Sequence, residues 1–137
     1  MKREIKEIII HCTATPEGRD VSIEEIRSWH LDRGWRDIGY HYVIDLEGRI
    51  HVGRGPNTIG AHTKGHNKHS IGIAYIGGTD AIHLEPKDTR TKEQKESLLF
   101  LIRFLKNDYP NAVVYGHRDF SDKSCPSFDA KEEYKDE

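Results

Sequence analysis

The chain has 137 residues, and its 21 Lys and Arg against 23 Asp and Glu give a formal net charge of −2 with histidine neutral. This length fits one domain, and the mixed charges form none of the basic patches that nucleic acid or an anionic membrane requires. The longest apolar run is the three isoleucines at 8–10, far short of the roughly 20 residues of a membrane span. We therefore expect one domain over residues 1–137, with no nucleic-acid and no membrane partner.

The first half of the chain is predicted to contain a buried strand, a helix and a hairpin. Residues 7–11 favour a strand because consecutive isoleucines are β-branched and the run is too short for a helix. A helix is predicted from Ser22, where Glu25 completes a capping box, to a stop at Gly34. Residues 39–45 alternate in side-chain character like a strand, and a turn joins them to residues 49–52 as a hairpin.

The second half begins with a segment rich in glycine, residues 53–69, which we predict to be an ordered loop. Residues 70–76 are predicted to form the next strand. Thr91 and Gln94 have the spacing of a second capping box. The helix that follows has an apolar stripe at helical spacing and ends before a proline: Leu98, Leu101, Ile102, Leu105 and Pro110.

The last predicted strand, residues 112–115, is followed by His117, as the first strand ends at His11. The first and last strands of a sheet can be spatial neighbours, so these two histidines can meet. The order of elements predicts the α/β class: a single domain with a central mixed sheet of about five strands, flanked by helices.

A metal site is one interpretation of the residues that follow these strands. His117 and Cys125 lie on one loop, and zinc accepts both imidazole nitrogen and thiolate sulfur. His11 is a possible third ligand, and three protein ligands with an open fourth position are typical of catalytic zinc. Cys12 alternates with His11 and is expected to point away from the metal as a buried free thiol.

Other interpretations of these residues stay open. A remote histidine plus His-x7-Cys is less specific than paired Cys-x2-Cys motifs, and residues alone favour Cys125 as a small buried hydrophobe and the histidines as hydrogen-bonded strand ends. A second group, His62, His66 and His69, has metal-like intervals. Glycines make a helix improbable there, so for that loop we rank surface or substrate contacts above metal binding.

Several blocks of sequence together resemble a known family, the zinc-dependent N-acetylmuramoyl-L-alanine amidases of type 2, which include phage lysozymes of the T7 type and the peptidoglycan recognition proteins. The resemblance extends nearly from end to end. It rests on these blocks in this order: Ile-Ile-His-Cys-Thr-Ala-Thr at 9–15, Gly-Trp at 34–35, Asp-Ile-Gly-Tyr-His-Tyr at 37–42, Gly-Ala-His at 60–62, Lys-Gly-His-Asn at 64–67, Gly-Gly at 77–78 and Lys-Ser-Cys-Pro-Ser-Phe-Asp at 123–129.

The resemblance implies that His11, His117 and Cys125 bind Zn²⁺, with Tyr40 and Lys123 as catalytic residues beside it. The implied substrate is the amide between N-acetylmuramic acid and L-alanine in bacterial peptidoglycan. The Tyr40 hydroxyl and the Lys123 ammonium are suitable donors for the tetrahedral oxyanion, and the proton for the leaving amine is left open between Tyr40 and zinc-bound water. Without the resemblance, Tyr40 would be a core aromatic and Lys123 a solvated charge.

We expect the groove to hold the sugar near Trp35 and His62, and the stem peptide near Thr13, Asn67 and Phe128. Each has an alternative: Trp35 can equally pack on the sheet, His62 can be a surface residue of its loop, and Phe128 can hold the Cys125 loop in place.

Three functions are compatible with these residues. The leading one is a zinc amidase, expected to be a monomeric phage or prophage endolysin. The charged N-terminus leaves no room for a signal peptide, so we expect synthesis in the cytoplasm and release to the cell wall through a separate permeabilising protein. The alternatives are a recognition module that binds peptidoglycan without hydrolysis and a zinc-stapled interaction domain. Cys125 favours the enzyme, because the resemblance implies that recognition-only relatives tend to lack this thiolate.

Overall fold

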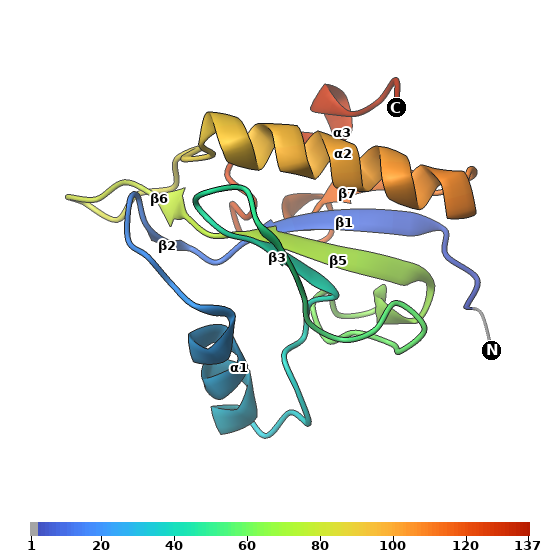
Figure 1. Ribbon diagram of the computed structural model, residues 1–137, viewed down its shortest axis with the longest axis horizontal. Helices are drawn as coiled ribbons and strands as arrows, with labels where there is room; N and C mark the ends of the chain where they lie inside the picture. The colour runs from blue at the N-terminus through green and yellow to red at the C-terminus, as the bar shows by residue number, and fades with distance from the viewer. Residues whose placement is uncertain (1–2) are drawn as a thin grey trace.

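The computed structural model of the protein describes residues 3–137. A five-stranded sheet has α2 across one face and α1 on the opposite side, together with the segment 53–69 (Figure 1). The elements in chain order are β1 (Glu7–Cys12), β2 (Thr15–Pro16), α1 (Ile23–Asp32), β3 (Tyr42–Ile44), β4 (Ile50–Val52), the short 3₁₀ helix η1 (Asn67–His69), β5 (Ser70–Tyr75), β6 (Gly78–Thr79), α2 (Lys92–Asp108), β7 (Val113–Gly116), the 3₁₀ helix η2 (His117–Asp119) and α3 (Ala130–Glu133).

The strand order of the main sheet is β4-β3-β5-β1-β7. β1 runs parallel to both β5 and β7, β3 runs parallel to β5, and β4 is antiparallel to β3. This confirms the predicted mixed sheet of five strands. Because Ile10 pairs with Gly116 in parallel register, the next residues, His11 and His117, lie at the same edge of the sheet. β1 continues beside β5 as far as Cys12.

Two apolar clusters lie on the two faces of the sheet. On the α2 side, Ile8 and Ile10 of β1 belong to the same buried cluster as the apolar stripe of α2. On the α1 side, Val43 of β3 is buried with Ile26 of α1 and with Ile38. The predicted stripe of α2 is therefore confirmed as its buried face, and β1 is anchored by side chains that have no exposed surface.

Both predicted helix starts are confirmed, since Ser22 with Glu25 and Thr91 with Gln94 form complete capping boxes. The predicted strand at 39–45 is shorter than expected. Only Tyr42–Ile44 is regular. The carbonyls of Gly39 and Tyr40 accept instead from the N–H groups of Ala61 and Arg54 in the loop that follows the hairpin. The two-residue pair β2 and β6 and the short helix α3 were not predicted, because segments of two to four residues have no hydrophobic period.

The predicted ordered loop at 53–69 is confirmed, and the Arg3 guanidinium holds it against β1. This side chain reaches the ring of His41 at 3.3 Å between Nη1 and Nε2. It also donates hydrogen bonds of 2.9–3.2 Å to backbone carbonyls at both ends of the loop: those of Pro56, Thr58, Asn67, Lys68 and Ser70. A charged donor shared among five carbonyls fixes a segment that has no strand pairing of its own.

Two buried histidines, His30 and His41, are held as neutral rings. The His30 Nδ1 accepts a hydrogen bond from the Gly39 N–H at 2.8 Å. The His41 Nδ1 accepts from the Gly72 N–H at 3.0 Å, and its Nε2 lies 2.7 Å from the Thr58 carbonyl oxygen. Burial lowers the pKa of each ring to about 4, which agrees with a nitrogen that must accept from a backbone N–H.

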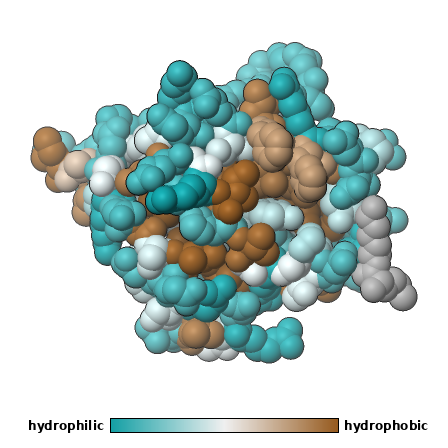
Figure 2. Space-filling model, in the orientation of Figure 1, coloured by the Kyte–Doolittle hydropathy of each residue, from teal (hydrophilic) through white to brown (hydrophobic). Residues whose placement is uncertain are grey.

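The surface seen in Figure 2 is mainly hydrophilic, with apolar patches near α2 and over the sheet. Phe100 and Phe104 of α2 are exposed, and their rings stack with centroids 6.3 Å apart. Within residues 3–137, no helix combines the length and the apolar character needed to cross a bilayer.

Replacing Arg3 by methionine should destabilise the fold. The aliphatic stem is retained, but the carbonyls of the 53–69 loop lose their charged donor, and hydrogen bonds to charged groups contribute roughly 1.5–3 kcal/mol each. We expect a loss of roughly 2 kcal/mol or more in the free energy of unfolding in urea, since water replaces some of the hydrogen bonds that Arg3 donates to these carbonyls. The control Lys6→Met removes an exposed cation and should change stability by less than about 0.5 kcal/mol. Equal stability of Arg3→Met and wild type would contradict the role given to Arg3.

Stability should fall as the pH is lowered from about 6.5 towards 4. The folded pKa of His30 and of His41 is about 4, below the ordinary value near 6.5, so the unfolded chain binds more protons in this window. Each ring then contributes a slope of up to about 1.4 kcal/mol per pH unit, with its stabilisation fully present above pH 6.5. NMR titration of the two rings and unfolding at pH 7.5, 6 and 5 measure this. If the rings protonate near pH 6.5 in the folded protein, the assignment is wrong.

Candidate metal centre

The structure brings His11, His117 and Cys125 together. Their ligand atoms all lie within 4.8 Å of one another, and among residues 3–137 they are the one such group of three or more potential metal ligands. His11 is the penultimate residue of β1 and is buried, while His117 begins η2 directly after β7, and the two ring centroids are 4.6 Å apart. The predicted convergence of two remote imidazoles and one late thiol is thus present in the fold.

Hydrogen bonds attach the Cys125 loop to the sheet. The Cys12 N–H donates to the Cys125 Sγ at 3.1 Å, and the Arg118 N–H donates to the Cys125 carbonyl oxygen at 2.7 Å. The Tyr75 hydroxyl of β5 donates to the Pro126 carbonyl oxygen at 2.6 Å. Cys12 is a free thiol buried in the cluster on the α2 side, as predicted.

The electrostatics of the three groups favour a bound cation. Burial, followed by the neighbouring His62 and His117, lowers the pKa of His11 well below its ordinary value. Burial and the Lys123 charge lower the pKa of His117, so both rings are neutral and offer lone pairs. The Cys12 thiol and burial raise the pKa of Cys125, a cost that a divalent cation offsets by binding the thiolate. Two imidazole nitrogens and one sulfur are a donor set that suits Zn²⁺.

Tyr40 and Lys123 lie beside this cluster. The Tyr40 ring centroid is 5.2 Å from that of His11 and 5.3 Å from that of His30. Burial, then the nearby thiols, raises the pKa of the Tyr40 phenol above its ordinary value of 10, so the hydroxyl keeps its proton. Lys123 is exposed on the loop before Cys125, and its charge acts on both His117 and Cys125.

Hollows lie on two sides of the cluster. One of about 60 Å³ opens between α1 and the end of β1, and its lining includes Thr13, Arg33 and Tyr40. The other, of about 330 Å³, lies against Lys123 and Cys125. The first hollow is therefore adjacent to Tyr40, and the second is adjacent to Cys125 itself.

The residues expected to contact substrate have different surroundings. The Thr13 Oγ1 lies 2.7 Å from the Thr15 Oγ1 and accepts from the Gly77 N–H at 2.9 Å. Trp35 is half-buried, with its ring centroid 4.7 Å from that of His30. Thr13 lines the hollow next to α1, whereas Trp35 packs on His30, which lines the same hollow.

Asn67 organises its loop. Its Oδ1 accepts hydrogen bonds of 2.9 Å from the backbone N–H groups of both His62 and Thr63. The side chain thereby fixes the turn that carries His62 towards β1.

Phe128 lies in the core, which corrects the expectation that it borders the groove. It is 8% exposed, and its ring lies under the Arg90 guanidinium, 3.4 Å from carbon to centroid. Tyr75 and Tyr134 also pack on it, with centroids 6.2 and 6.3 Å away. This position agrees with the alternative prediction, that Phe128 supports the segment carrying Cys125.

The second histidine group does not converge. His62 contacts His11, with 2.8 Å between Nδ1 and Nε2. His66 lies 3.1 Å from the Glu7 carboxylate and stacks on the Phe120 ring, and His69 reaches the Glu4 carbonyl oxygen. The ranking of this group below the remote trio is therefore confirmed by geometry.

Sequence reasoning missed the polar residues behind the cluster. Thr63 and Ser70 are buried, and both hydroxyls contact the His62 ring. Their one signal in the sequence was the presence of small hydroxyl residues next to His62 and at the first position of the predicted strand at 70–76.

Comparison with known proteins agrees with this site. The family model described as N-acetylmuramoyl-L-alanine amidase matches residues 1–128. The endolysin of Klebsiella phage KP32 is 41% identical over 130 residues, which cover 95% of this chain and 85% of that protein.

Solved structures are similar along nearly the whole chain. The N-acetylmuramoyl-L-alanine amidase LysC from Clostridium intestinale URNW has a TM-score of 0.80 at 30% identity, covering 96% of this chain and 83% of that one. A Drosophila PGRP-LB variant in complex with tracheal cytotoxin has a TM-score of 0.78 at 30% identity, covering 99% and 83%.

The matched region contains every element of the main sheet and all three clustered side chains. The fold predicted from the sequence and its resemblance to this group of amidohydrolases are both confirmed. The chain belongs to the N-acetylmuramoyl-L-alanine amidase family, and its activity is that of the family, hydrolysis of an amide.

Proposed function

We propose that the protein is a zinc-dependent endolysin that hydrolyses the amide between N-acetylmuramic acid and the L-alanine of the stem peptide. The observation that carries this proposal is the convergence of His11, His117 and Cys125 within 4.8 Å. Three protein donors are the number found in catalytic zinc sites, whereas structural sites are closed by a fourth.

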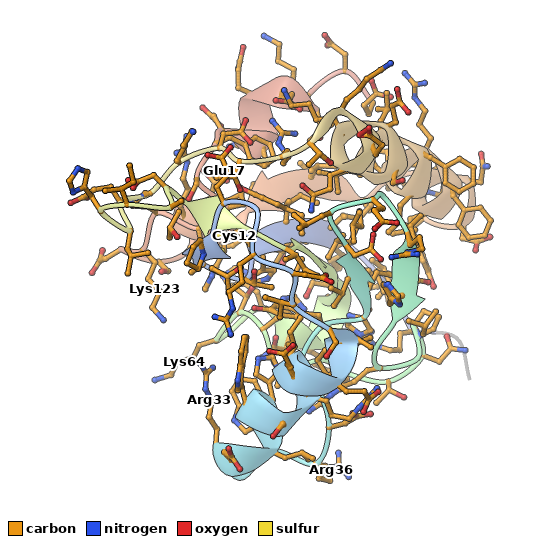
Figure 3. The ribbon with its side chains drawn as sticks, turned by 60° about the vertical axis from the view of Figure 1, so that its left-hand side comes forward. Cys12, Glu17, Arg33, Arg36, Lys64 and Lys123 are labelled. Carbon is orange, nitrogen blue, oxygen red and sulfur yellow. The ribbon has the colours of Figure 1, made fainter. Side chains whose placement is uncertain are left out.

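Peptidoglycan as the substrate is supported by relatives and by charge. The phage relative is an endolysin, and the Drosophila relative holds tracheal cytotoxin, a peptidoglycan fragment. In Figure 3, the cationic side chains of Arg33, Lys64 and Lys123 project along one side of the molecule from three different segments. Arg33 and Lys123 each line one of the hollows beside the cluster, where cations favour the carboxylates of a stem peptide.

The residues that would hold the zinc ion are His11, His117 and Cys125. When bound, zinc supplies Lewis-acid chemistry, which polarises a carbonyl and makes water more acidic. The chain's own contribution is to keep both imidazoles neutral by burial and to fix the thiol through the Cys12 N–H.

Tyr40 and Lys123 are the proposed donors to the charge that develops on the scissile carbonyl oxygen. Attack by water on an amide carbon creates a tetrahedral oxyanion, which is stabilised by donors already in place. Burial keeps the Tyr40 phenol protonated, so it donates a hydrogen bond. The Lys123 ammonium adds a positive charge from the loop that carries Cys125.

The rest of the substrate is proposed to extend into the flanking hollows. Thr13 and Tyr40 line the hollow next to α1, and Trp35 packs against His30 of the same hollow. Thr13 and Trp35 are therefore the proposed contacts there. Asn67 contributes through the loop backbone that it fixes.

As an endolysin, the protein would act on the bacterial cell wall. We propose that it works as a monomer, synthesised in the cytoplasm and released to the wall through a separate permeabilising protein. Synthesis in the cytoplasm and release to the wall are proposed because the phage relative is an endolysin.

Removal of the metal should abolish hydrolysis and leave peptidoglycan binding intact. Incubation of the protein with muropeptides, followed by mass spectrometry of released stem peptide, should show no product after chelation and recovery when Zn²⁺ is returned. Cys125→Ser should reproduce the chelated state, because a serine hydroxyl is a poor zinc ligand. Cleavage that resists chelation would contradict the zinc mechanism, and a wild type that binds without cleaving would indicate a recognition module instead.

Replacing Lys123 by methionine should lower kcat by about 10²–10³, the loss expected for one oxyanion donor. Zinc affinity should change little, because Lys123 is not a ligand. Lys68→Met, an exposed cation on a different loop, is the matched control and should retain full activity. A loss confined to KM would show that Lys123 binds substrate and does not stabilise the transition state.

A further inference from the structure

His62 has a specific contact with His11 that the reaction scheme above does not use. The His62 Nδ1 lies 2.8 Å from the His11 Nε2, and the two rings meet edge to face at 88° with centroids 4.9 Å apart. An imidazole has two ring nitrogens, and the nitrogen that makes this hydrogen bond is not available to bind a metal. With Nε2 directed to His62, the atom of His11 left for a metal is Nδ1.

The second nitrogen of His62 is also engaged. Its Nε2 lies 3.2 Å from the Ser70 Oγ. The Thr63 Oγ1 lies 3.0 Å from the His62 Nδ1 and 3.2 Å from the His11 Nε2. The polar atoms of the ring thus face protein groups, and the side chain is oriented from both ends.

Two glycines, Gly60 and Gly72, pack closely against the His62 ring. A Cβ at Gly72 of β5 would come within 2.6 Å of the ring carbons Cγ and Cδ2. A Cβ at Gly60 would come within 2.8 Å of Cδ2. Because both approaches are closer than real Cβ contacts, the backbone at these positions is shaped to hold this ring.

The hydrogen bonds determine where the protons lie. If the His11 Nδ1 gives its lone pair to a metal, the His11 Nε2 carries a proton and donates it to the His62 Nδ1. The His62 ring must then be protonated at Nε2, from which it donates to the Ser70 Oγ. The Thr63 Oγ1, 3.2 Å from the His11 Nε2, is a second acceptor for the His11 proton. Both ring protons in this arrangement therefore have an acceptor.

We propose that His62 is a positioning residue for metal binding: it fixes the tautomer and orientation of His11 so that Nδ1 faces His117 and Cys125. The inference rests on the proposed zinc site and assigns His62 a role other than substrate contact. Metal-bound histidines commonly donate their second N–H to a carboxylate, a carbonyl or water, and loss of that partner typically costs 10–100-fold in metal affinity or activity. Here the partner is a neutral imidazole.

The test compares two substitutions of similar size and polarity. The oxygen of His62→Asn can occupy the position of Nδ1 and accept from His11, whereas the oxygen of His62→Gln lies one bond farther out, at the position of Nε2. His62→Leu removes the acceptor. His69→Leu is the control on the same segment, since the His69 Nδ1 lies 3.1 Å from the Glu4 carbonyl oxygen and His69 is not one of the three clustered side chains. Zinc dissociation constants are measured by competition with a chromophoric chelator on purified metal-free protein.

We expect His62→Leu and His62→Gln to bind Zn²⁺ about 10–100-fold more weakly than wild type, and His62→Asn to recover most of the affinity. His69→Leu should match wild type. In zinc-loaded wild-type protein, ¹H–¹⁵N NMR should show His11 protonated at Nε2. Should His62→Leu fail to fold, the Asn and Gln pair answers the question without it.

Unchanged zinc affinity in His62→Gln and His62→Leu would overturn the inference, and a raised KM for muropeptides at unchanged affinity would return His62 to substrate contact. These results leave the zinc site itself intact. A wild-type protein that binds no zinc would overturn both the site and the inference, and this outcome is distinguishable because it appears before any variant is compared.

Discussion

The parallel pairing of β1 with β5 and β7 is the constraint on which the site depends. β1 is held in register by isoleucines with no exposed surface on the α2 side, and a slip of one residue would move them to the opposite face. The same slip would turn His11 into the cluster under α2 and bring Cys12 to the α1 side. Burial of the isoleucines therefore decides that the His11 ring, and not the Cys12 thiol, faces the His117 ring.

Behind the three clustered groups, a chain of polar contacts continues into the fold. It runs from His11 through His62 to Ser70. A separate set of contacts joins the Gly72 N–H, the His41 ring and the Thr58 carbonyl oxygen. The three rings are neutral because burial lowers their pKa values. Hydrogen-bonded buried networks give a defined geometry, and the 53–69 loop, which has no strand pairing, receives such bonds from the Arg3 guanidinium and the His41 ring.

Patterns local in sequence predicted most of the fold, because the isoleucine run and the two capping boxes specify their own conformation. The meeting of His11 with His117 was also predictable, since parallel neighbours end at one edge. The role of Phe128 was not, because its main contact, Arg90, lies 38 positions away and belongs to no motif. The contact between His62 and His11 spans 51 positions. The sequence does not show the path of the loop, and this path directs the His62 ring to His11 instead of to the expected sugar.

The C-terminal segment beyond the family match has a consequence for protein engineering. Arg90, whose side chain is 2% exposed, binds Asp88 and also reaches forward to Glu133 at 2.8 Å and to the Tyr134 hydroxyl at 3.0 Å. The family match ends at residue 128. A chain cut there would lose Glu133 and Tyr134, which bind Arg90, and Phe128 would lose its contact with Tyr134. Chimeric enzymes that append a targeting module should therefore place the junction after Tyr134.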